Sequence, residues 1–286
     1  MSLVATTKRY VADERWRLRL FESLAIETQR VAAALHEPQF SAQGSWSEAE
    51  FRRRVAAINE LLSELLRAEA LMGRWSTEPM RDSLTLGPKR LSDGVGEGCG
   101  NSGLLALQWY PALLLFYAGG IAAVSAASYG SLVAVMHARV STPRGDKMLV
   151  EAATSGLGDL RPHFKTLSGD EKHYVPFSEY LHTTLRPVLD ETLYLGSEYE
   201  RAFDAFEILY AVEFCHQTDR CLGPIGRFGW KSTRGGSNPL GQLINEAASA
   251  GKNWPPLAAG LCDGSPEKFA KHAKGLSETI ARSGMW

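Results

Sequence analysis

Hydrophobic residues recur at helical spacing through much of the chain, and the clearest example is the segment 48–74. Its apolar residues follow one another at alternating spacings of four and three, which places them on one face of a helix. This seam consists of Phe51, Val55, Ile58, Leu62, Leu65, Met72 and Trp75. Two interpretations stay open: a bundle helix whose seam is covered by its own chain, which is the favoured one, or a coiled-coil helix that waits for a partner.

Local signals mark where this helix begins. Ser47 and Glu50 have the spacing of a capping box, and Trp46 and Phe51 occupy the two positions of a hydrophobic staple. A second amphipathic stripe over 8–35 ends before Pro38, because proline disfavours a helical conformation in the residue that precedes it. The first 75 residues are therefore predicted to form an N-terminal helical pair.

The run from 98 to 136 carries no charge, and 104–127 is nearly all apolar or small. This stretch is long enough to span a bilayer. Gln108 and Pro111 interrupt it, and Tyr129-Gly130 predicts a tight turn, so a buried helical hairpin is favoured over a membrane segment. Gly119 and Ala123, four residues apart, would allow another helix to approach closely in either setting.

The remaining segments complete an all-α prediction. Residues 76–103 are predicted to be an irregular Gly-rich connector, 140–175 are loop-rich, and helices are predicted at 178–195 and 198–217, the latter introduced by a capping box of Ser197 and Glu200. Asn238-Pro239 and Ser265-Pro266 each predict the start of a further short helix. The expected fold is an irregular multi-helix bundle or a short helical-repeat-like array of about eight helices. Residues 104–286 are predicted to form the main helical domain. Residues 1–75 either pack with it as one domain or form a separate unit.

Composition narrows the function classes. The 31 basic and 32 acidic residues nearly balance, which argues against a strong global attraction to nucleic acid or anionic lipid. The four cysteines are widely scattered, and the N-terminus has no apolar signal region. A cytoplasmic protein with reduced thiols is the expectation.

Candidate sites for a metal or a nucleotide are weak. Cys215, His216 and Cys221, with Cys262 as a further candidate, have the residue types of a zinc site but no standard spacing. Cys215 ends an apolar helix, where cysteine behaves as a small hydrophobe. The loop 94–103 is rich in glycine but lacks the Gly-Lys-Ser/Thr of a phosphate-binding loop, so a flexible connector is favoured over a nucleotide site. No Gly-x-Ser-x-Gly or His-Glu-x-x-His motif occurs, and neither catalytic residues nor a cofactor are predicted.

The loop 223–236 combines aromatic and basic residues between glycines. Its candidates for binding a partner or an anion are Arg227, Phe228, Trp230, Lys231 and Arg234. Tryptophan and arginine are the residue types that anchor protein interfaces. The alternative, given equal weight, is that both aromatic rings pack inward while the charges stay in water.

Three segments resemble a helical module of multidomain bacterial proteins: Trp109–Val124 followed by Tyr129-Gly130, Pro176–His182, and Gly223–Gly229. In those proteins the module is attached to sirtuin-like, TIR-like or Schlafen-type domains associated with antiviral defence. The resemblance covers at most about 105–230, on an apolar helix pattern and one loop, and the signature motifs of those effector domains do not occur here. It therefore implies a sensing or regulatory part and transfers no catalytic residue.

The sequence predicts a non-enzymatic helical interaction or regulatory protein, as a subunit or sensor of a bacterial antiviral-defence or stress system. It would bind another protein, or a second copy of itself, through 48–74 and 223–236. One alternative is a membrane-acting effector that inserts 104–136. The other is a metal- or nucleotide-dependent enzyme that uses 94–103 or the Cys215, His216 and Cys221 group. An uncovered apolar face on 48–74 would be the structural sign of a missing partner.

Overall fold

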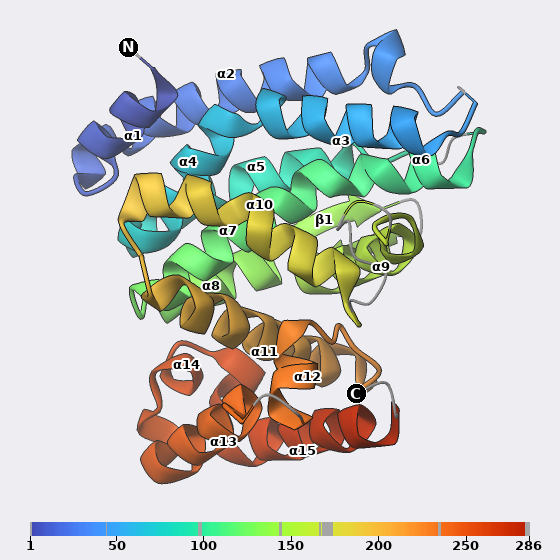
Figure 1. The fold of residues 1–286 in the computed structure, drawn as a ribbon. Helices are drawn as coiled ribbons and strands as arrows, with labels where there is room; N and C mark the ends of the chain where they lie inside the picture. Colours follow the sequence, from blue (N-terminus) through green and yellow to red (C-terminus); the bar gives the residue numbers. More distant parts are fainter. Residues whose placement is uncertain are drawn as a thin grey trace.

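The helices are stacked roughly in chain order, from α1 and α2 at one end of the molecule to α13 and α15 at the other (Figure 1). The computed structural model describes residues 2–43, 45–96, 99–142, 145–165, 167, 174–233 and 236–283. The first end is built from α1 (Leu3–Tyr10), α2 (Arg17–Leu35), α3 (Glu48–Leu61), α4 (Ser63–Trp75) and α5 (Arg81–Asp93). The middle contains α6 (Ser102–Ala106), α7 (Tyr110–Ser125), α8 (Tyr129–His137), α9 (Leu149–Leu160) and α10 (Pro176–Leu193). The other end consists of α11 (Glu198–Thr218), α12 (Arg227–Thr233), α13 (Pro239–Ala250), α14 (Pro255–Ala258) and α15 (Pro266–Ser283).

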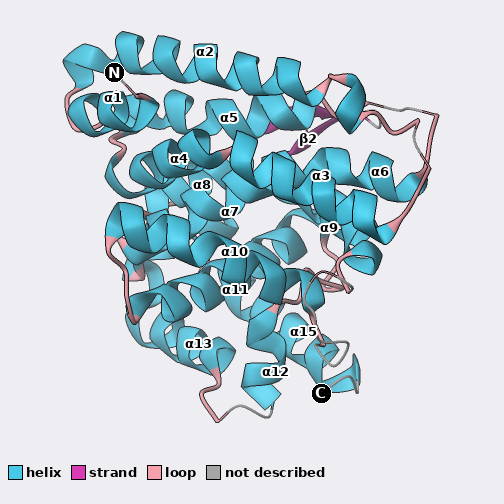
Figure 2. Cartoon of the chain, turned by 45° about the horizontal axis from the view of Figure 1, so that its top comes forward, coloured by secondary structure: helices cyan, strands magenta, loops and turns pink. Residues whose placement is uncertain are grey.

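The fold is helical apart from one small hairpin in the described residues (Figure 2). Strands β1 (Arg139–Thr142) and β2 (Gly145–Met148) pair antiparallel, with Val140 opposite Lys147. The prediction of a loop-rich stretch over 140–175 was therefore wrong for this hairpin and for α9. Four-residue strands of which only Val140 is fully buried are too short to show a clear alternation of apolar and polar residues.

Helix α7 lies at the centre of the core, and its glycines set how closely its neighbours approach. A Cβ atom added at Gly73 of α4 would lie 2.2 Å from the carbonyl oxygen of Gly119, and one added at Gly120 would lie 2.1 Å from the Phe206 ring. The stretch Ser102–Ser125 is long and apolar enough to cross a membrane, but 89% of its most apolar window is buried inside the fold. A turn then leads into α8, so the apolar run forms the buried helical hairpin that the sequence favoured.

The apolar seam of 48–74 is covered by the chain itself. All of its residues are buried except Trp75, which is 44% exposed. Ser47 accepts a hydrogen bond from the Glu50 backbone N–H, and the Trp46 and Phe51 rings lie 5.0 Å apart, which confirms the predicted start of the helix. The helix is interrupted at Leu62, so 48–74 forms α3 and α4 rather than one helix.

Two other expectations need correction. The helices, which are numbered up to α15, exceed the predicted number of about eight. The short ones were missed because they lie in segments without a clear apolar stripe. The segment 76–103 is not an irregular connector, since it contains α5. The Gly87-Pro88 pair is a helix-breaking signal, but burial of Leu84 and Leu91 on one face outweighs it. Residues 1–75 and 104–286 contribute to the same hydrophobic core.

Candidate functional site

The cations predicted in the loop 223–236 point into the protein. Arg227 and Lys231 lie on α12 and are buried, Phe228 is fully buried, and Trp230 is partly exposed. Arg234 lies outside the described residues. Of the two arrangements expected for this loop, Phe228 follows the inward one, but the charges of Arg227 and Lys231 are not left in water.

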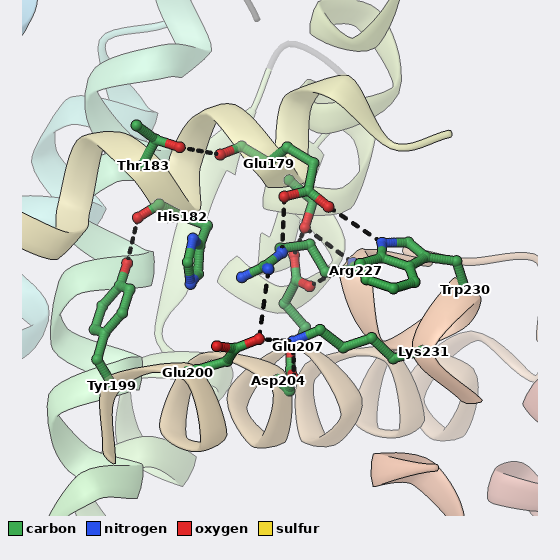
Figure 3. A network of polar contacts seen from close by, with 11 residues as sticks. Glu179, His182, Thr183, Tyr199, Glu200, Asp204, Glu207, Arg227, Trp230 and Lys231 are labelled. Carbon is green, nitrogen blue, oxygen red and sulfur yellow. Dashed lines mark hydrogen bonds and ion pairs between the residues drawn. The ribbon is translucent and has the colours of Figure 1, made fainter. Parts of the chain in front are cut away.

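These two cations meet three carboxylates from α10 and α11 (Figure 3). Lys231 Nζ donates to Glu200 Oε1 and to Asp204 Oδ2, both at 2.6 Å. Arg227 Nε lies 2.8 Å from Glu179 Oε2, as an ion pair without the angle of a good hydrogen bond, and its Nη2 lies 3.6 Å from Glu200 Oε1. We call this set of five charged residues the α12 charge network.

Glu207 fixes the start of α12 beneath that network. Its Oε2 accepts a hydrogen bond from the Arg227 backbone N–H at 3.0 Å, and its Oε1 accepts from Ser178 Oγ at 2.7 Å and from Tyr117 Oη at 3.2 Å. Glu207 is only 2% exposed. A Cβ atom at Gly226 would lie 2.0 Å from Glu207 Oε2, so only glycine fits where the chain enters α12. Burial raises the pKa of Glu207 to about 7.

The two carboxylates that share Lys231 have pKa values shifted in opposite directions, because they differ in burial. The hydrogen bond from Lys231 lowers the pKa of Glu200, whose side chain is half exposed. Burial raises the pKa of Asp204 although Lys231 pulls it down, because the Asp204 side chain is only 8% exposed. Three carboxylates against two cations leave an excess of negative charge, which grows when Glu207 ionises.

His182 of α10 lies beside this network as a neutral side chain. Burial, and then the charge of Arg227, lowers the pKa of His182 to about 3. Its Nε2 and Arg227 Nη1 are buried, and neither has a hydrogen-bond partner within the described ranges. The Tyr199 hydroxyl donates to the His182 carbonyl at 2.8 Å and ties α11 to α10.

A cleft of about 810 Å³ borders the α12 charge network. It lies between α11, α13 and the turn that joins α7 to α8, and we call it the α11–α13 cleft. Asp204, Lys231 and Glu200 form part of its wall, and its other charged lining residues are of both signs: Arg74, Arg201, Glu198 and Glu246. Of these four, Arg74 donates a hydrogen bond from Nη1 to Ser125 Oγ at 3.2 Å.

Of the predicted zinc residues, Cys215 and Cys221 interact with each other, because burial and then the Cys221 side chain raise the pKa of the Cys215 thiol, whereas His216 pairs with an aspartate. His216 Nε2 lies 3.1 Å from Asp263 Oδ2, whereas Cys221 Sγ lies 3.7 Å from the His272 carbonyl oxygen. Cys215 is buried, and burial raises the pKa of its thiol. Within the described ranges, no group of three or more His, Cys, Asp or Glu residues could hold a metal ion. Glu97 and Gly98 of the Gly-rich loop are not described, so the predicted nucleotide loop lies partly outside the structure.

The carboxylates of the site were missed in the sequence, although a signal for them exists. Glu200 was assigned to a capping box with Ser197, but the Ser197 side chain caps nothing and Glu200 binds Lys231. Asp204 and Glu207 lie in a helix whose apolar residues are not confined to one stripe, and most of its residues are buried. A carboxylate in a buried helix needs a partner, and the nearby Arg227 and Lys231 were available candidates.

Comparison of the chain with known protein families, with curated proteins and with solved structures finds no match. The functional argument therefore depends on the geometry of the α12 charge network and the α11–α13 cleft.

Proposed function

We propose that the protein is a non-enzymatic helical interaction module that acts as a regulator by holding a segment of a partner protein in the α11–α13 cleft. The observation that carries this proposal is the cleft itself, with a volume of about 810 Å³ and a wall that contains the buried Asp204–Lys231 ion pair. Pockets of this size are typical of binding sites. The α12 charge network holds one side of the cleft in place, so little ordering is needed when a partner binds.

The hydrogen bonds that the acidic groups already make within the protein favour a binding function over a catalytic one. Glu207 has a pKa close to neutrality, as a general acid or base requires. However, it is sealed behind Gly226, and both of its oxygens accept hydrogen bonds from the protein. Glu200 and Asp204 border the cleft, but both are engaged by Lys231. These groups stabilise the wall of a binding site and are poorly placed to exchange protons with a substrate.

The charges around the cleft indicate what kind of segment would fit. Arg74 and Arg201 can pair with acidic side chains, and Glu198 and Glu246 with basic ones. Asp204 Oδ1 has no hydrogen-bond partner among the residues that the structure describes, and it can accept a hydrogen bond from the segment if the wall relaxes around it. A short extended peptide with both an acidic and a basic residue matches this pattern.

The other functions considered from the sequence have less support. Since the seam of 48–74 is covered by the chain, the partner is assigned to the cleft instead of α3 and α4. Insertion of 104–136 into a membrane would require unpacking α7 from the core. A role in antiviral defence or stress rests on the resemblance over 105–230 alone and stays a prediction.

Site-specific photo-cross-linking in the native cells tests the proposal. A benzophenone side chain is placed at Gln242, which lines the cleft, or at Asn245, an exposed position on the same helix that does not line it. Cross-linked products are identified by mass spectrometry, and the partner segment is then synthesised as a labelled peptide.

We expect one partner to cross-link from position 242 and not from 245, and its synthetic segment to bind the purified protein. Arg201→Glu should weaken binding of that segment about tenfold by placing repulsive charge beside its acidic residue. Equal cross-linking from both positions, or a segment that binds wild type and Arg201→Glu alike, contradicts the proposed use of the cleft.

A further inference from the structure

A second cavity is lined by residues of α2, α3 and α5. These helices lie at the end of the molecule away from α12–α15 (Figure 1). The cavity has a volume of about 90 Å³ and is enclosed by the C-terminal ends of α2 and α5, by α3, and by the segment that leads into α7. Its walls are mainly apolar, and the aliphatic and aromatic groups include Ala32, Leu35, Phe40, Ile58, Leu91 and Leu107. We call it the α2–α5 pocket.

The polar residues of this pocket are basic or neutral, and no aspartate or glutamate among the described residues lines it. Arg54 is already committed, because its Nε donates to Glu50 Oε1 at 2.7 Å and its Nη1 donates to the Ser41 carbonyl oxygen at 2.6 Å. Arg90 differs: its side chain is exposed, and it forms no ion pair within the part of the chain that the structure describes. Arg90 is therefore the cation available to a ligand.

Gln108 supplies an uncharged polar group to the same pocket. Its Oε1 is buried and has no hydrogen-bond partner in the described part of the chain. A buried acceptor that lacks a partner is costly. The oxygen and nitrogen of a glutamine amide exchange places by a half-turn, after which the amide nitrogen can donate to a ligand oxygen.

We propose that the α2–α5 pocket binds a short-chain aliphatic carboxylate, with its chain among the apolar walls and its carboxylate between Arg90 and the Gln108 amide. Apolar walls with a few polar groups are typical of small-molecule sites. An arginine guanidinium pairs with a carboxylate through charge-assisted hydrogen bonds. The volume favours a short chain, since it is smaller than the cavity of about 150 Å³ that accepts benzene in an engineered protein.

A ligand titration followed by protein NMR tests this assignment with pentanoate as the probe. Three matched compounds separate the contributions of the aliphatic chain and of the negative charge. Acetate lacks the long chain, 1-pentanol lacks the charge, and pentylamine carries a positive charge instead of a negative one. Pentanoate should give saturable shifts and bind at least tenfold more tightly than each of the others. Absence of saturable binding, or equal affinity for pentylamine, overturns the proposal.

Matched variants show whether the binding occurs in this pocket. Arg90→Gln should weaken pentanoate binding about tenfold, while Lys89→Gln, at the neighbouring exposed position, should leave it within twofold. Ala32→Leu fills the pocket and should abolish binding, whereas Ala33→Leu, which is exposed on the same helix, should not.

The comparison of Arg90→Gln with Lys89→Gln decides the result even if Ala32→Leu fails to fold, because the Arg90 side chain lies on the surface and its replacement should not disturb the core. Equal losses in Arg90→Gln and Lys89→Gln place the ligand elsewhere and refute the assignment. None of these outcomes changes the expectation for the α11–α13 cleft, which lies at the other end of the fold.

Discussion

Replacing Glu207 by glutamine should remove a pH dependence that this buried carboxyl imposes on the stability of the fold. Burial raises the pKa of Glu207 from 4.5 to about 7 in the folded protein, whereas the unfolded chain returns it to about its ordinary value. Between these two pH values the folded state binds more protons than the unfolded state. The free energy of unfolding of the wild type therefore falls as the pH rises through this interval.

The size of the effect follows from the two pKa values. The difference between 4.5 and about 7 corresponds to roughly 3 kcal/mol, present below pH 4.5 and lost once the pH has passed 7. Glutamine has nearly the same shape but cannot ionise, so Glu207→Gln never incurs the cost of a buried charge. Its amide can donate to Ser178 Oγ or Tyr117 Oη, and its carbonyl can accept from the Arg227 N–H.

Urea unfolding followed by circular dichroism at pH 5 and pH 8.5 measures the prediction. The stability of Glu207→Gln relative to wild type should increase by about 2.5 kcal/mol between the two pH values, because a small part of the full change has already occurred at pH 5. Other titrating groups are common to both proteins and cancel in this difference. Glu246→Gln, which alters an exposed carboxyl, should show no such change. A difference that is constant with pH, or that has the opposite sign, would refute the argument that burial raises the pKa of Glu207 in the folded protein.

Three further substitutions test the packing and the charge network, each measured by urea unfolding. Gly73→Ala should destabilise the fold by about 2 kcal/mol or more, because its Cβ would lie 2.2 Å from the Gly119 carbonyl oxygen, whereas Gly96→Ala meets no atom within 4 Å and should have little effect. Lys231→Met should cost about 3 kcal/mol by leaving Asp204 buried and unpaired, and adding Asp204→Asn should restore part of that loss; an unchanged stability in Lys231→Met contradicts the pairing. Trp46→Ala should cost about 1–2 kcal/mol through loss of its ring contact with Phe51, and a neutral result would mean that the staple does not stabilise α3.

The parts of the fold that the sequence predicted are those whose signals are local. Ser47 and Trp46 mark the start of α3 because a cap and a staple involve residues only a few positions apart. The seam from Phe51 to Met72 was recognised because helical periodicity is repeated along one segment. The break at Leu62 and the presence of α5 were missed, since both depend on packing against distant helices.

The sequence indicated the two cations of the candidate site but not the carboxylates that pair with them. Arg227 and Lys231 stood out as charged residues in a glycine-rich loop, but their partners Glu179 and Asp204 are 48 and 27 residues away along the chain. No local pattern reports which carboxylate meets which cation across helices. The two arrangements weighed for the loop both kept the cations at the surface or in water, and neither included ion pairs buried beneath α12.

The most direct test of the proposed function is a titration of the partner segment recovered by cross-linking, labelled with fluorescein, against purified protein. Gln242→Trp places a large ring in the α11–α13 cleft, and Asn245→Trp places the same ring at an exposed position on the same helix outside the cleft. If the cleft holds the segment, Gln242→Trp should raise the dissociation constant at least tenfold, while Asn245→Trp leaves it within twofold of wild type. Binding to Gln242→Trp with the affinity of the wild type would contradict the central claim.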